Sequence, residues 1–425
     1  MTKNILNLPV DILVNVLKKL GLSDLRNVIL TCKTLRSLVV NDNTIWRSIC
    51  RDKLILEDPL HNRSNNEQNW YNRCRISNNW CSGYFKNKVI VQFHSNYMPW
   101  LKLHNSEILA VSKGSELLCY AVDRKKIPNS KSTCWTLSVP TVSRNDVRTH
   151  DISRFVIRNN TLVCGNRDGS TAVYKIPYYK QKPLLLHHIQ DCHENGQVEV
   201  SAVELIETSD FCYIVTASNN SQNIIFWQSN ENGYNITDSI MDIPIHNGEG
   251  VRCMAVNNVM DKLAIGLDGN SKPLLLDIHI GKYLMTADST RNSKQAIRDI
   301  GWHNNNTIMY VTHSGMLHLM DTRTNDFVFN VKDPFLSTLY CIKSDNKNAI
   351  VVGSSEYSRC VLFDARNCTK HVQIYFTQTR PSPVYCLDFD STRLLTAVDR
   401  GISALNFNIN TFNVQARDYS HVFQS

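Results

Sequence analysis

Histidine and cysteine are the residue types in this chain best suited to metal binding, but their spacing does not favour it. Cys192 and His193 lie near His187 and His188, and no second ligand pair stands at the distance along the chain that a zinc site uses. No Cys-x-x-Cys pair occurs among the fourteen cysteines. The sequence therefore predicts no metal and no cofactor.

Catalytic chemistry is also not predicted. His303, His313 and His318 are close in sequence, but no nucleophile or carboxylate accompanies them in a catalytic pattern. The chain has no phosphate-binding glycine loop, no His-Glu-x-x-His helix and no Gly-x-Ser-x-Gly turn. We expect a non-catalytic protein.

A third set of polar residues recurs at one position of a repeated run. The runs begin at Val251, Ile297, Leu339 and Val384, and their second residues are Arg252, Arg298, Tyr340 and Tyr385. On successive blades of a propeller, matching positions of the innermost strand converge around the central channel. We hypothesise that these four bind a substrate, the arginines engaging a carboxylate or phosphate. The alternative is that they point into the channel and form local hydrogen bonds.

The elements that must position these residues are short strands. Runs rich in β-branched and aromatic residues begin near residue 88 and repeat about every 40 to 50 residues, as in a propeller. Counting a less regular unit at Trp100–Val122 gives seven units, whose stacking would close a ring. We expect Val89–Phe93 to close it as the outer strand of the last blade. Residues 410–425 have the composition of a disordered polar tail.

The amino-terminal residues predict a small helical module followed by a connector. Apolar residues at helical spacing and helix-ending signals predict three helices over residues 5–51. So small a module cannot bury all its apolar side chains, so some should face a partner; a self-contained bundle is the alternative. Residues 52–87 predict a loop and a short docking helix, whose aromatic residues are Trp70, Tyr71, Trp80, Tyr84 and Phe85.

The distribution of charge and of cysteines indicates which partners and which cellular compartment to expect. Most of the net charge of +8 comes from residues 1–90, which hold fourteen Lys/Arg and seven Asp/Glu, whereas the remainder holds thirty-two and thirty-one. A nearly neutral propeller gives no strong case for nucleic acid. No signal peptide or membrane span is predicted. Several cysteines stand singly in apolar runs: Cys119, Cys164, Cys253, Cys341 and Cys386. We interpret them as core residues of a protein in a reducing compartment, the cytoplasm or the nucleus.

Residues 5–51 resemble the F-box through Leu8-Pro9-x-Asp11-Ile12-Leu13, Leu25, Cys32 and Trp46. This resemblance implies binding to a Skp-family adaptor and, through it, to cullin. The residues that would contact the adaptor are Leu8, Pro9, Ile12, Leu13, Val16, Leu17, Leu25, Cys32 and Trp46.

The repeats resemble degraded WD blades. The family's terminal aspartate is matched by Asp277, Asp321 and Asp364, and only Trp227 keeps the tryptophan. Asp168, Asp268 and Asp399 match the family's turn aspartates, and we interpret all six as structural. The order of an F-box, a connector and a propeller over 88–409 resembles the dactylin branch of the F-box and WD-repeat proteins.

The resemblance implies an α-helical module joined to an all-β, seven-bladed propeller. It also implies the substrate-recognition subunit of a Skp–cullin–F-box ubiquitin ligase, which holds a protein for ubiquitination and degradation. The alternative is a non-catalytic scaffold whose helical front binds a different partner.

Overall fold

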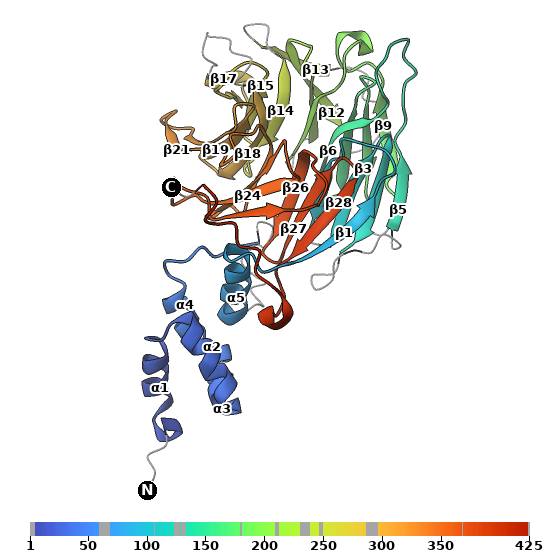
Figure 1. Ribbon diagram of the computed structural model, residues 1–425. Helices are drawn as coiled ribbons and strands as arrows, with labels where there is room; N and C mark the ends of the chain where they lie inside the picture. The colour runs from blue at the N-terminus through green and yellow to red at the C-terminus, as the bar shows by residue number, and fades with distance from the viewer. Residues whose placement is uncertain are drawn as a thin grey trace.

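A ring of β-sheets with a group of helices on one side makes up the protein (Figure 1). The computed structural model describes residues 5–58, 69–105, 107–122, 128, 133–178, 181–208, 212–229, 239–245, 250–285, 296–367 and 369–423. The α-helices among them are α1 (Val10–Leu17), α2 (Leu22–Thr31), α3 (Lys33–Asn41), α4 (Asn43–Ile49) and α5 (Trp70–Cys81).

The helical module contains one more helix than the sequence indicates. The expected second helix is divided into α2 and α3 because Cys32 has an extended backbone, with φ −152° and ψ 161°. Its Sγ accepts a hydrogen bond from the Leu35 amide at 3.5 Å and so caps α3. Asp42 caps α4 by accepting a 2.7 Å hydrogen bond from the Thr44 amide.

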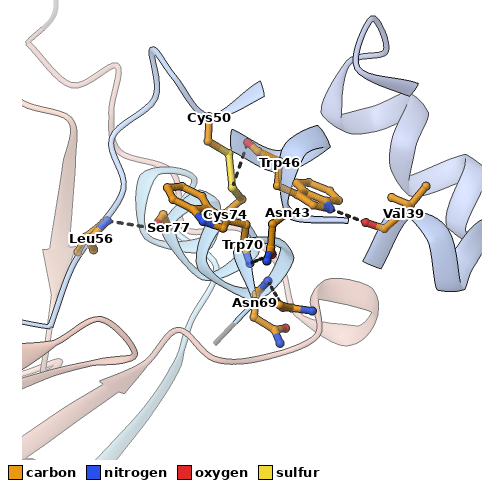
Figure 2. The surroundings of a disulfide bond; sticks show 10 residues. Val39, Asn43, Trp46, Cys50, Leu56, Asn69, Trp70, Cys74 and Ser77 are labelled. Atoms are coloured by element: carbon orange, nitrogen blue, oxygen red, sulfur yellow. Dashed lines mark hydrogen bonds between the residues drawn. A yellow bond between two sulfur atoms is a disulfide. The ribbon is translucent and has the colours of Figure 1, made fainter. Parts of the chain in front are cut away.

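The module has its own core, to which α5 contributes. Trp46 is 4% exposed, and its Nε1 donates to the Val39 carbonyl at 2.6 Å (Figure 2). A disulfide between Cys50 and Cys74 joins the end of α4 to α5. This pair corrects the expectation of reduced cysteines. The five cysteines predicted to be core residues are free and buried, as expected.

Helix α5 bridges the helical module and the sheets. Trp70 and Tyr71 at its start pack against the core of the module, whereas Trp80 near its end is fully buried against the sheets. The Trp80 ring stacks on Phe407 at 3.7 Å between centroids, and its Nε1 donates to the Ser391 carbonyl at 2.9 Å. The predicted docking role is confirmed for Trp80 and Phe85, which lie in the same cluster.

The described strands form seven four-stranded antiparallel sheets, which we number as blades in chain order. Blade 1 is β2 (Leu101–His104), β3 (Ile108–Lys113), β4 (Glu116–Ala121) and β5 (Thr133–Ser138). Blade 2 is β6 (Ile152–Arg158), β7 (Thr161–Asn166), β8 (Thr171–Lys175) and β9 (Leu184–Ile189). Blade 3 is β10 (Ala202–Glu207), β11 (Cys212–Ala217), β12 (Asn223–Ser229) and β13 (Ser239–Pro244). Blade 4 is β14 (Val251–Val256), β15 (Lys262–Leu267), β16 (Leu274–Asp277) and β17 (Lys282–Met285).

The last three blades complete the ring. Blade 5 is β18 (Ile297–Asn304), β19 (Thr307–Thr312), β20 (Met316–Asp321) and β21 (Phe327–Lys332). Blade 6 is β22 (Leu339–Ser344), β23 (Ala349–Ser354), β24 (Arg359–Asp364) and β25 (Gln373–Phe376). Blade 7 is β26 (Val384–Asp390), β27 (Arg393–Val398), β28 (Gly401–Asn406) and β1 (Lys86–Gln92). The pairing of β1 with β28 confirms the predicted ring closure by a strand that precedes blade 1.

Blade 3 keeps a hydrogen-bond network that explains its tryptophan. Trp227 Nε1 donates to Thr216 Oγ1 at 2.9 Å, and His193 Nε2 lies 3.0 Å from the same oxygen. Burial lowers the pKa of His193 to about 4, so the ring is neutral at pH 7. His193 thus ties the connection between blades 2 and 3 to two strands of blade 3, a structural role that the sequence did not indicate.

The carboxy-terminal residues do not form the disordered tail that their composition predicts. The Arg417 amide donates to the Gly83 carbonyl at 2.9 Å, and the Tyr419 amide donates to Gln373 Oε1 at 2.8 Å. Phe423 then packs edge-on against Phe335, with centroids 4.9 Å apart. This segment, which we call the strap (residues 410–423), runs from the end of α5 along the outer strand of blade 6.

Candidate adaptor and target surfaces

Helix α1 and the turn before it carry an apolar stripe that the described residues leave exposed. Leu8 is 42% exposed, Ile12 is 47% and Val16 is 45%. Their spacing of four residues places the last two on one face of the helix, one turn apart. Pro9 and Cys32 are also at least partly accessible. We call Leu8, Ile12 and Val16 the α1 stripe.

The other residues expected to contact an adaptor lie inside the module. They are at most 6% exposed: Leu13, Leu17, Leu25 and Trp46. Leu17, Leu25 and Trp46 belong to one cluster with residues of α3, α4 and α5. In this structure they hold the helices together, so direct contact with a partner is not available to them. The sequence pattern could not separate the two sets because both follow helical spacing.

The four residues predicted to bind a substrate do lie in a row. In each of their strands the register shifts at the second residue, so Arg252, Arg298, Tyr340 and Tyr385 each fall at a β-bulge. A bulge redirects the side chain of the extra residue. The Arg298 guanidinium lies 5.5 Å from the Tyr340 ring centre, and Tyr340 contacts Tyr385 edge-on at 5.9 Å. We call these four residues the rim row.

Local contacts hold the two ends of the rim row. Arg252 Nη2 forms an ion pair with Asp268 Oδ2 at 2.9 Å, and the Tyr385 hydroxyl donates to Asp399 Oδ1 at 2.7 Å. Two turn aspartates therefore orient rim residues, beyond shaping their turns. Their contacts are the local hydrogen bonds of the alternative interpretation.

Arg298 is less well neutralised than Arg252. Its Nη2 lies 2.8 Å from His313 Nδ1, and among the described residues no carboxylate lies within ion-pair distance of it. Burial, together with the neighbouring Arg252, lowers the pKa of the Arg298 guanidinium. The Nε atoms of both arginines are buried without a hydrogen-bond partner in the described chain. This part of the rim row therefore has an excess of positive charge.

Comparison with known proteins finds one match to the amino-terminal helices and others over most of the chain. A sequence model of the F-box-like family matches residues 5–52. A mouse protein named F-box/WD repeat-containing protein 4 is 22% identical over 350 residues, which is 79% of this chain and 77% of the relative. The human protein of the same name is 22% identical over 416 residues, covering 94% and 92%. The chain therefore carries an F-box-like segment at its amino end and is similar to F-box/WD repeat-containing proteins over most of its length.

Carboxylates inside the channel connect neighbouring blades. Asp388 Oδ2 of blade 7 accepts from the Leu103 amide of blade 1 at 3.0 Å. Asp299 Oδ2 of blade 5 accepts from the Ile342 amide of blade 6 at 3.0 Å. Glu204 joins blade 3 to blade 4 in the same way. We call these three residues the channel carboxylates.

Each channel carboxylate also has a basic partner. The ion pairs are Lys102–Asp388 at 3.6 Å, Arg154–Asp299 at 3.5 Å and Arg158–Glu204 at 3.7 Å. Because each carboxylate has both an amide donor from a neighbouring blade and a basic partner, we assign these residues a structural role. Sequence reasoning missed this set, although an acidic residue within an otherwise apolar innermost strand was a usable signal.

The described residues contain no group of three or more His, Cys, Asp or Glu that could hold a metal ion. Within the same residues, no helix is both long enough and apolar enough to cross a membrane.

Proposed function

We propose that this protein is the substrate-recognition subunit of a Skp–cullin–F-box ubiquitin ligase. The F-box would bind the Skp-family adaptor, and the propeller would hold the protein to be ubiquitinated. The chain itself would be non-catalytic, and it would work in the cytoplasm or nucleus. The observation that carries the proposal is the uncovered α1 stripe within the residues that match the F-box-like family.

The physical argument for a partner at α1 is the cost of exposed apolar surface. Three aliphatic side chains, each nearly half exposed, form one continuous stripe, and such a stripe is typical of a docking face. Burying a fully exposed aliphatic side chain contributes on the order of 1.5 to 3 kcal/mol before ordering costs, and because these three are already about half covered, each would contribute roughly half of that. The stripe would therefore supply a large part of the affinity for an apolar groove on the adaptor.

The scaffold alternative has one observation in its favour. Four of the nine residues expected to contact the adaptor, including Leu13 and Leu17, are buried by the protein's own packing. A self-contained bundle also has buried residues at these positions. The two functions differ in what the α1 stripe binds, so the stripe is where they can be separated.

The test is the affinity of the purified full-length protein for a purified Skp-family adaptor, measured by calorimetry. The variant Ile12→Asp, Val16→Asp places charge on the stripe without disturbing the buried core. Val147→Asp is the matched control, since Val147 is fully exposed in a loop of the propeller. We expect the double variant to lose about a hundredfold or more in affinity and the control to bind as wild type.

Equal adaptor binding by the wild type and the double variant, or no binding by either, would reject the proposal and favour the scaffold. Substitutions at Leu13 and Leu17 are unsuited to this test because both side chains are buried. Their loss would unfold the module whatever it binds.

The target end is tested separately with Arg252→Gln, Arg298→Gln. Proteins that co-purify with wild type and variant are compared by quantitative mass spectrometry, with unchanged thermal unfolding as the check on folding. We expect the variant to lose a subset of partners while it retains adaptor and cullin. An unchanged set of partners would contradict a binding role for these arginines.

A further inference from the structure

A second exposed feature lies beside the rim row, on the loops between blades 5 and 6. Leu336 is 72% exposed, Tyr357 is 52% and Phe423 is 63%. They come from the loop before β22, the turn between β23 and β24, and the end of the strap. Phe335 lies between them, 6.4 Å from Tyr357 and 4.9 Å from Phe423. We call Leu336, Tyr357 and Phe423 the upper patch.

The backbone of the upper patch is held in an unfavourable conformation. Leu336 has φ +57°, Tyr357 has φ +60° and Phe423 has φ +57°. Bulky side chains rarely adopt the left-handed region, which costs on the order of 1 kcal/mol or more per residue. The three residues also present apolar side chains to solvent, which makes this surface a candidate contact for another molecule.

A buried ion pair fixes the loop that carries Leu336. Asp333 and Arg359 have no exposed side-chain surface and pair at 2.7 Å. The same Asp333 oxygen accepts from the amides of Phe335 and Ser337, each at 3.0 Å. Ser337 Oγ in turn donates to Glu356 beside Tyr357 at 3.1 Å. The upper patch is therefore preorganised, and ordering it on binding would cost little.

The upper patch and the rim row are continuous. Thr338, two residues after Leu336, donates through Oγ1 to the His313 carbonyl at 2.7 Å. The ring of His313 contacts Arg298. An extended peptide could therefore span both features within a few residues.

We propose that the upper patch is a second contact site for the target, taking a bulky apolar side chain. The occupant is an extended segment of another protein in which an aliphatic or aromatic residue lies a few positions from an acidic group. The acidic group is inferred from charge complementarity, because Asp268 forms an ion pair with Arg252 and the described residues place no carboxylate within ion-pair distance of Arg298. This inference rests on the proposed function and names the class of segment that the propeller would select.

Glycine substitutions give a clean test. Leu336→Gly, Tyr357→Gly removes the two side chains while glycine tolerates the left-handed backbone, so folding should be preserved or improved. Val259→Gly is the matched control, because Val259 is 61% exposed in a turn of blade 4. A displayed library of random twelve-residue peptides is selected on the full-length wild-type protein. Enriched peptides are then measured on each variant by fluorescence polarisation.

We expect enriched peptides to combine an acidic residue with a bulky apolar residue. Their affinity should fall about tenfold or more in the glycine variant and stay unchanged in the control. Replacing the apolar residue of the peptide should cost a similar factor on wild type and little on the glycine variant. Arg298→Gln should remove only the contribution that the acidic residue of the peptide makes to the affinity.

Failure to enrich any peptide on wild type would overturn this inference, as would peptides that bind the glycine variant with wild-type affinity. Adaptor binding, measured on the same preparations, keeps the two proposals apart. A protein that binds the adaptor but no such peptide retains the proposed function and loses this contact site. A protein that binds neither loses both.

Discussion

Asp388 offers the sharpest test of how the ring is closed. Its Oδ2 accepts from the Leu103 amide of blade 1, and its Oδ1 accepts from the Phe389 amide at 3.1 Å. Lys102, also of blade 1, lies 3.6 Å from the same carboxylate, whose side chain is 9% exposed. One carboxylate therefore joins the last blade to the first from inside the channel.

Asp388→Ala would leave two amides and an ammonium group without their partner. Removing one member of a buried charged pair typically costs about 3 to 5 kcal/mol, and a lost hydrogen bond to a charged group about 1.5 to 3. These figures overlap, because both include the same desolvation. We expect the free energy of unfolding to fall by about 3 to 5 kcal/mol.

The assay is urea unfolding followed by tryptophan fluorescence, with the slope of the transition compared between proteins. Glu116→Ala is the control, because its pair with Lys113 is formed by side chains that are 42% and 38% exposed. We expect that control to change the stability by less than about 0.5 kcal/mol. A loss below about 1 kcal/mol for Asp388→Ala would refute the view that this carboxylate fastens the ring.

Three further predictions concern other parts of the chain. Trp80→Ala should cost about 3 to 5 kcal/mol and expose the connector, so limited proteolysis should separate the F-box from the propeller faster than in wild type. Burial lowers the pKa of His318 to about 4, so the stability that it contributes is present above about pH 6.5 and is lost as the pH falls towards 4. Replacing it by Phe should flatten that part of the pH–stability curve, and an unchanged curve would count against the assignment. Cys50 and Cys74 are 24 residues apart, so Cys50→Ser should lower the free energy of unfolding of the oxidised protein by about 3 kcal/mol and have a much smaller effect under dithiothreitol.

The sequence was sufficient for the propeller because its information is periodic. Each blade repeats an innermost strand, a turn and a second strand, so an irregular unit such as blade 1 is recovered from its neighbours. The ring-closing strand followed from the same count. The additional helix break at Cys32 did not follow, because a thiol that caps a helix looks like any apolar residue at helical spacing.

The sequence pattern could not predict contacts between residues that are far apart in the chain. The pairing of Asp333 with Arg359 and the docking of the strap on blade 6 depend on how the chain turns, and neither has a local signature. The exposure of the α1 stripe could not be predicted from the sequence pattern either. The sequence indicated which residues are apolar, but only the packing of α3, α4 and α5 decides that Leu17 is covered and Val16 is not.

The proposed receptor function requires a fixed distance between the two binding ends, and the contacts at the junction of α5 can maintain that distance. The first half of α5 lies in the core of the F-box and the second half in the core of blades 6 and 7. Gly83 follows directly, and a Cβ at that position would lie 2.1 Å from the Arg417 carbonyl oxygen of the strap. The strap therefore packs closely against the end of α5 and extends to Phe335 beside the upper patch. Because rigid contacts connect both ends through one helix and one strap, the proposed function predicts that a change at the junction alters ubiquitin transfer without altering the affinity for either partner.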